Sequence, residues 1–228
     1  MSENRNDFPR SFGLRKARSI VNASTVLLAQ MLPHCSARQI SVKYWPTSDI
    51  VELSFVDQGP VVPLLNLKAE KHFTYVYPEI VYSNMFLDIR ENAISFHGKS
   101  WIDAIPLELG AERIAREVAV LVTEQDIDQT IAKSTPQYYL EACKPTSNPW
   151  SWFETAVYAI YLGLDQKGHN ALEEAMRLAR KDGRWIYRDL ILTAKDYLAK
   201  LEKDAEALRQ ELNTVMEGNW SRFRIVES

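Results

Sequence analysis

The chain has 228 residues and a mass of 26.2 kDa, enough material for one large domain or two closely packed subdomains. Hydrophobic residues make up 46% and charged residues 25%, as in ordinary globular proteins, and ten prolines and eight glycines are too few for a disordered chain. The net charge of -3 and the pI near 5.9 argue against a dedicated nucleic-acid-binding protein, which is normally basic. We therefore expect a folded protein without a nucleic-acid partner.

The charge is unevenly spread along the chain. Residues 1–46 hold seven Lys or Arg against Glu3 and Asp7, a net charge of +5, so the remaining residues carry -8. A basic run of this kind is usually the solvated start of a helix, and that is our expectation. The alternative is an arm that contacts phosphate or an acidic partner. Its basic residues are Arg5, Arg10, Arg15, Lys16 and Arg18.

The first half of the chain predicts a helix followed by a sheet. Apolar residues recur at intervals of three and four over residues 14–32, which is typical of an amphipathic helix, and Pro33 ends the run. Alternation with period two then predicts strands, joined by connections too short for crossover helices, so the sheet should be antiparallel. The predicted strand segments are RQISVKYWP, IVELSFVD, residues 61–67, HFTYVYP, MFLDI and AISFH.

The second half predicts helices. GAERIAREVAVLVTEQDIDQTI is helical, KPTSNP at residues 144–149 is a linker, and the helix that follows it is apolar on two faces and hence buried. An amphipathic helix comes next. A long last helix is predicted from Trp185 to Glu217, with Gly218 as its terminator.

These elements together predict an α+β fold. It consists of an N-terminal helix, an antiparallel sheet of about five or six strands, and a C-terminal helical bundle with a long last helix. We divide the chain into residues 1–109, the N-terminal helix plus the sheet, and residues 110–228, the helical part, within one compact domain.

The segment AISFHGKSW matches a relaxed phosphate-loop pattern, because four residues separate an alanine, Ala93, from Gly98, Lys99 and Ser100. A phosphate loop needs a flexible turn whose amides surround the phosphates and a helix that begins at the lysine. If this segment bound a nucleotide, Lys99 and Ser100 would contact its phosphates. The protein would then be a small-molecule or nucleotide-handling enzyme.

The residues around this motif favour a strand over a phosphate loop. Ile94 and Phe96 alternate with polar neighbours, and a helix starting at Gly98 would meet Pro106 within about two turns. We therefore predict that MFLDIRENAISFHG is a hairpin that ends in a turn at Gly98. Lys99 should then point to water.

Catalytic and metal-binding patterns are missing from the sequence. The four histidines, His34, His72, His97 and His169, form no His-Glu-x-x-His helix and no paired ligand spacing. His34 lies beside Cys35, but neighbours in sequence seldom face each other as a nucleophile and its base must. We expect no metal, no cofactor and no catalytic site, although active sites can also assemble from residues far apart in the sequence.

The cysteines and the early apolar segment indicate a location. Cys35 and Cys143 are far apart and have no metal-ligand spacing, which fits the reducing cytoplasm. In IVNASTVLLAQMLP the longest apolar run is the four residues Val26 to Ala29. This is shorter than a signal-peptide core and far shorter than the roughly 18 apolar residues of a membrane span. We expect a cytoplasmic protein without membrane contact.

Aromatic residues are densest in NPWSWFETAVYAIY. Buried aromatics usually belong to the core, but Trp and Tyr also dominate protein interfaces. The C-terminal segment NWSRFRIVES either docks on the sheet or forms an exposed contact element. The candidates for partner binding are Trp150, Trp152, Phe153, Trp220 and Phe223, together with Arg5, Arg10 and Arg15 of the N-terminal arm.

The predicted last helix carries Leu201, Leu208 and Leu212 on one stripe. We expect this stripe to pack against the two preceding helices of the same molecule. The alternative is a homodimer, or docking of a partner, through the last helix.

The function expected from these patterns is non-catalytic. The chain should be a protein-interaction module, namely an immunity-type, chaperone or adaptor protein. Its acidic bulk suits a basic protein partner, because opposite charges speed encounter. The alternatives are the nucleotide-handling enzyme described above and nucleic-acid contact through the basic arm.

Overall fold

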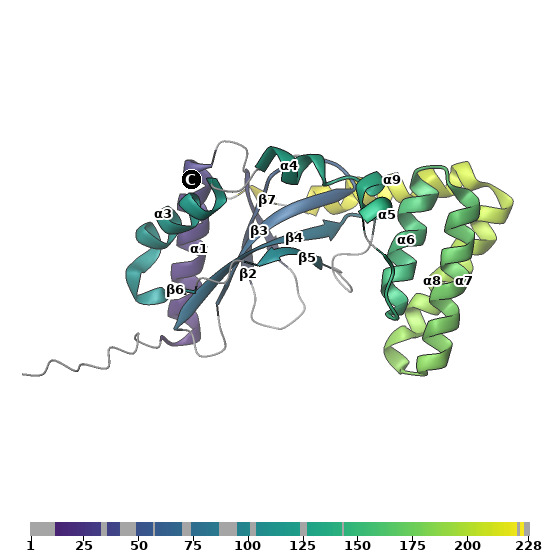
Figure 1. Ribbon diagram of the computed structural model, residues 1–228, viewed down its shortest axis with the longest axis horizontal. Coiled ribbons are helices and arrows are strands. Elements are labelled where there is room, and N and C mark those ends of the chain that lie inside the picture. The colour runs from purple at the N-terminus through teal and green to yellow at the C-terminus, as the bar shows by residue number, and fades with distance from the viewer. Residues whose placement is uncertain are drawn as a thin grey trace, which may run out of the picture.

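The computed structural model of the protein (Figure 1) begins with a helix, as predicted. This helix, α1, covers Leu14–Met31 and buries Ala17, Val21 and Leu28 on one face. It ends where the backbone of Leu32 becomes extended. The structure describes residues 12–32, 36–41, 49–56, 58–69, 74–86, 95–100, 104–123, 127–142, 144–222 and 224–225.

The strands form one antiparallel sheet, which confirms the prediction from the alternating segments. The strand order is β5-β4-β3-β2-β1-β7, and β6 pairs with β4. In the part of the chain that the structure describes, five strands have six residues or more and two have only two. The strands are β1 Ser36–Ser41, β2 Asp49–Ser54, β3 Val61–Ala69, β4 Tyr75–Asn84, β5 Ser95–Ser100, β6 Ile105–Pro106 and β7 Arg224–Ile225.

The strand predicted for MFLDI is wrong at its first two residues. β4 ends at Asn84, and Met85 and Phe86 form a turn. The Asn84 side chain accepts a hydrogen bond from the backbone N–H of Phe86 at 3.0 Å, which is the local geometry by which asparagine ends a strand. The last residues of the segment lie outside the described residues.

The hairpin predicted for MFLDIRENAISFHG is confirmed only in its second strand, β5, because the strand paired with it is β4, which ends before Met85. Phe96 is opposite Tyr82 in the antiparallel register, so its predicted strand character is confirmed. Ile94 lies outside the described residues.

Gly98 lies inside β5, so the turn predicted there is wrong. Ile80 of β4 is paired with Lys99, whereas the next residue, Val81, is paired with His97. Gly98 is therefore the extra residue of a β-bulge, a position at which glycine is common.

The helices complete the predicted α+β fold. α6 is buried without interruption from Phe153 to Ile160, as predicted for the helix after the linker. Its first residue is Pro149, and the Asn148 side chain accepts a hydrogen bond from the backbone N–H of Trp150 at 3.1 Å, so the cap is Asn148. The remaining described helices are α3 Gly110–Thr123, α4 Ile127–Ala132, α5 Pro136–Ala142, α7 Asp165–Asp182, α8 Arg188–Lys203 and α9 Ala205–Arg222, with short 3-10 helices η1 Leu107–Leu109 and η2 Trp185–Tyr187.

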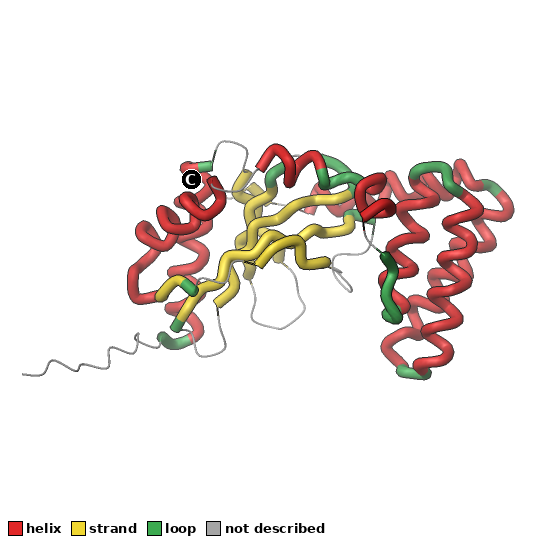
Figure 2. Tube along the Cα trace, viewed as in Figure 1, coloured by secondary structure: helices red, strands yellow, loops and turns green. Residues whose placement is uncertain are grey.

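Helices cover both faces of the sheet (Figure 2). Successive residues of a strand point to opposite faces. Accordingly, Leu65 and Leu67 of β3 belong to one core with α1 and α3. Val62 and Leu64 of the same strand belong to a separate cluster with Trp220 of α9. α9 thus runs from the helical bundle to the sheet (Figure 1).

The single helix predicted from Trp185 to Glu217 is wrong. The segment forms η2, α8 and α9, with a break at Asp204. Asp204 has an extended backbone, φ -161° and ψ 91°, and its carboxylate accepts a hydrogen bond from the backbone N–H of Ala207 at 3.0 Å. An aspartate in this position caps a new helix, so the chain changes direction there.

α9 continues past Gly218, so the predicted terminator is wrong too. The Asn219 side chain donates to the carbonyl of Met85, and the Trp220 indole N–H donates to the carbonyl of Gly59, both at 2.8 Å. These bonds to the ends of strands hold the last turns of the helix. At these residues the C-terminal segment docks on the sheet and is not an exposed contact element.

α6 and α7 approach closely at Gly168. A Cβ atom at this position would lie 2.5 Å from Cγ1 of Ile160 and 3.4 Å from the carbonyl oxygen of Ala156. A real Cβ atom does not tolerate 2.5 Å, so only glycine fits unless the Ile160 side chain or α6 itself moves. The bundle is therefore built around this contact.

Substitution Gly168→Ala tests the close packing of α6 and α7. We expect the free energy of unfolding to fall by about 1–3 kcal/mol, because overpacking outweighs the gain in helix propensity of about 1 kcal/mol. Urea unfolding followed by circular dichroism measures the change. The matched control is Gly218→Ala in α9, where a Cβ atom would meet nothing within 4 Å. This substitution should stabilise the helix. Equal effects of the two substitutions would contradict the packing.

Candidate functional site

Lys99 and Ser100, the candidate phosphate contacts, lie inside β5. Lys99 is opposite Ile80 and Ser100 is opposite Glu79 of β4. A phosphate loop offers the free amides of a turn and of a helix start, whereas Lys99 and Ser100 have the extended backbone of an edge strand. The backbone at Lys99 therefore does not form the cradle that a nucleotide site requires.

The basic N-terminal arm is described only in part. Arg15 is exposed on the first turn of α1, and Lys16 lies 5.1 Å from the ring centre of Phe12. Such a contact is a weak cation–π interaction at an exposed site. Arg5 and Arg10 lie outside the described residues.

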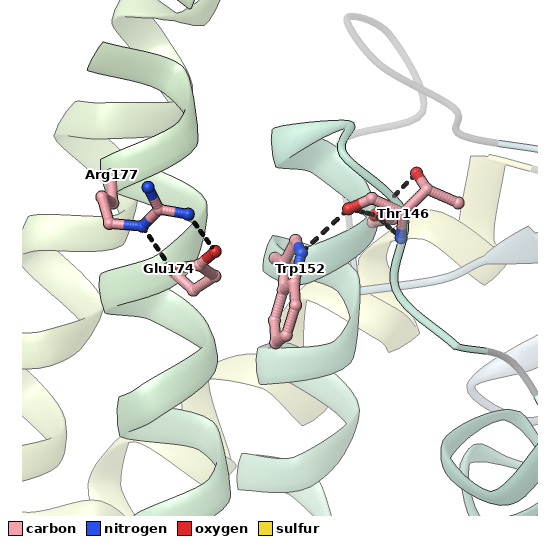
Figure 3. A network of polar contacts seen from close by, with 5 residues as sticks. Thr146, Trp152, Glu174 and Arg177 are labelled. Atoms are coloured by element: carbon pink, nitrogen blue, oxygen red, sulfur yellow. Dashed lines mark hydrogen bonds and ion pairs between the residues drawn. The ribbon is translucent and has the colours of Figure 1, made fainter. Parts of the chain in front are cut away.

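The aromatic cluster of α6 packs largely against the bundle. Phe153 is only 1% exposed and stacks on Tyr197 of α8 with ring centres 5.8 Å apart. Trp150 and Trp152 are half-buried. The indole N–H of Trp152 donates to the carbonyl of Thr146 at 2.9 Å (Figure 3). These aromatics therefore fix α6 and the preceding linker in place.

The remaining candidates at the C-terminus also contact the protein itself. Trp220 is half-buried on the sheet, and Phe223 lies outside the described residues. Leu201, Leu208 and Leu212 are buried in the core of the bundle. This leucine stripe packs within the molecule, as the sequence analysis expects.

Glu154 of α6 lies at the centre of a buried polar cluster. Its side chain is enclosed, with the residue only 2% exposed. One carboxylate oxygen accepts a hydrogen bond from the Asn84 amide at 3.2 Å, and the other accepts one from the Tyr139 hydroxyl at 2.9 Å. Asn84 ends β4 and Tyr139 belongs to α5, so one carboxyl connects the sheet to two helices.

Burial raises the pKa of the Glu154 carboxyl from its ordinary value of 4.5 to about 7. The hydrogen bonds from Tyr139 and Asn84 favour the charged form and lower the pKa, but by less than desolvation raises it. The group therefore changes its charge near neutral pH while it remains enclosed. Chemically it can bind or release a proton, and structurally it joins three elements.

The outer face of α8 is a second candidate site. Trp185 is 85% exposed, and Leu192, seven residues further, is 55% exposed. Leu192 lies on the side of α8 that is turned to solvent, and Trp185 lies in η2, directly before the helix. The opposite side carries the residues that pack in the bundle core: Leu190, Ala194, Tyr197 and Leu201.

The sequence pattern did not reveal this face, because the same segment also carries the stripe of core residues. Once Leu190, Ala194 and Tyr197 are assigned to the core, Leu192 falls on the opposite side of the same helix. A large apolar residue on the polar side of an amphipathic helix is the signal that could have found it.

Three general findings bear on the class of function. Over the described ranges, His, Cys, Asp and Glu side chains form no group of three or more that could hold a metal ion. No helix in that part of the chain combines the length and the apolar character needed to cross a bilayer. A scan against protein-family models finds no match, and neither does a search of the curated proteins or of the solved structures.

Glu154 makes the stability of the fold depend on pH. Its folded-state pKa of about 7 lies above its ordinary value of 4.5, so the folded protein binds the proton more tightly than the unfolded chain. This stabilisation is complete below pH 4.5 and is lost as the pH rises to 7. At about 1.4 kcal/mol for each pKa unit, the free energy of unfolding should fall by about 3 kcal/mol.

Urea unfolding of wild type and Glu154→Gln at pH 5 and pH 8 measures this effect. Because glutamine does not titrate, the free energy of unfolding of the variant should change little between pH 5 and pH 8. Relative to that of wild type, it should therefore be higher at pH 8 than at pH 5. Glu217→Gln, at an exposed position of α9, should behave as wild type. An equal pH dependence of wild type and Glu154→Gln would contradict the assignment.

Proposed function

We propose that the protein is a cytoplasmic, non-catalytic protein-interaction module of the immunity, chaperone or adaptor type, and that it contacts its partner through the outer face of α8. The observation that carries this proposal is the exposure of Trp185. An 85% exposed tryptophan is costly to keep in water and is typical of an interface that a partner covers.

The other described tryptophans differ from Trp185, because they pack within the molecule. Trp150, Trp152 and Trp220 are all half-buried, and the indole N–H groups of Trp152 and Trp220 are hydrogen-bonded within the molecule. Folding of the protein therefore uses these three side chains. Trp185 is different, because it is almost fully exposed in η2, the 3-10 helix directly before α8.

The surroundings of Trp185 also fit a protein contact. Ile186 is 42% exposed beside it, and Leu192 extends the apolar surface along α8. An apolar centre with charged residues around it is the usual anatomy of a protein interface. The charged residues on this side of α8 are of both signs: Arg188, Asp189, Lys195 and Asp196. The local contact is therefore with a surface of mixed charge.

Capture experiments with Trp185→Ser test the proposed function. We expect immobilised wild-type protein to retain partner proteins from the native cell, and Trp185→Ser to bind them roughly tenfold or more weakly, as for an interface hot spot. Mass spectrometry of the retained proteins gives the comparison.

The matched control is Val120→Ser on α3. Val120 is 58% exposed and lies on a helix that packs against α1, so its substitution also removes an exposed apolar side chain. We expect this variant to retain the partners that wild type retains. Identical capture by wild type and Trp185→Ser would refute the assignment of the face.

A further inference from the structure

The outer face of α8 contains a repeat of seven residues. Leu192 and Ala199 of α8 are seven residues apart, and Trp185 precedes Leu192 by seven residues in η2; all three are exposed. Because seven residues are close to two turns, Leu192 and Ala199 form a row along α8, about 10 Å long at 1.5 Å per residue, with Trp185 of η2 beyond its N-terminal end. We call this row the apolar line. α8 continues for one more turn, to Lys203.

Opposite charges flank the apolar line. Each residue turns a helix by about 100°, so Arg188 and Lys195 lie on one side of the line and Asp189 and Asp196 on the other. All four are exposed. Among the described residues, Arg188, Lys195 and Asp189 form no ion pair. Asp196 binds Lys200 at 2.7 Å, but its side chain is still 55% exposed.

We infer that the occupant of this face is a second copy of the chain, related by a two-fold axis parallel to α8. Rotation about such an axis brings the apolar lines of the two copies together. It also places the basic side of each helix against the acidic side of the other. Arg188 and Lys195 of one copy then meet Asp189 and Asp196 of the second copy. The inference rests on the proposed function, because it names the partner of the same face.

The charge pattern decides between the two orientations of such a dimer. An axis across the helices would give an antiparallel pair and would bring the basic sides together, with Arg188 and Lys195 against their own equivalents. Like charges in contact are unfavourable, so the antiparallel pair is disfavoured. Only the parallel pair makes the surface complementary to itself, as a two-fold interface must be.

The size of the face predicts the strength of the association. One helix face is smaller than a standard protein interface, so the dimer should be weak and reversible. Its flanking charge pairs are exposed at the rim, so added salt should weaken it further. In this dimer the small side chain of Ala199 lets the two helices approach closely at the C-terminal end of α8. The Trp185 rings of the two copies lie at the N-terminal end.

Charge reversal tests the inference. The first variant combines Arg188→Asp with Lys195→Asp, which makes both flanks acidic. The second variant combines Asp189→Lys with Asp196→Lys, which makes both flanks basic. Sedimentation equilibrium should show wild type as a concentration-dependent dimer and each variant alone with a dissociation constant raised about tenfold or more. An equimolar mixture of the two variants should recover the dimer, which also shows that both are folded.

Each result of this experiment is decisive. Wild type that stays monomeric at all concentrations overturns the inference. So do variants that dimerise as well as wild type, and a mixture that does not recover the dimer. If wild type is monomeric but Trp185→Ser still loses captured proteins, the face serves a different partner and the proposed function stands. If both measurements are negative, both proposals fail.

Discussion

The buried carboxyl of Glu154 is the constraint on which the relation between the sheet and the bundle depends. Moving a carboxylate out of water is unfavourable unless hydrogen-bond donors surround it. Here Asn84 at the end of β4 and Tyr139 of α5 supply these donors. The position of α6 is thereby fixed against the sheet. α7 packs on α6 through Gly168, and α8 packs on α7.

This arrangement separates the residues that fold the protein from those that remain available for contact. The inner side of α8 is used in the core, and most aromatics of α6 and α9 are used within the molecule. The outer side of α8 contributes nothing to that core, yet it holds the exposed Leu192, and η2 directly before it holds the exposed Trp185. Exposed apolar surface of this kind is unfavourable in water, and in the proposed function a partner covers it.

Local patterns in the sequence predicted what local physics controls. The helix of α1 and the alternating strands follow from apolar periodicity, and the strand at Phe96 was predicted for the same reason. The prediction of a turn at Gly98 was wrong because a bulge depends on the partner strand. The break at Asp204 was not predicted because the apolar pattern continues across it. The cluster at Glu154 was out of reach, since its hydrogen-bond partner Asn84 is 70 residues away.

The most direct test of the account is a disulfide at residue 199. In a chain with Cys35→Ser and Cys143→Ser, the substitution Ala199→Cys places one thiol on the apolar line. A two-fold axis parallel to α8 puts the two thiols opposite each other, so mild oxidation should give a covalent dimer. Val120→Cys in the same background should stay monomeric. Monomers alone from Ala199→Cys, or equal cross-linking of both variants, would contradict the parallel pairing of α8.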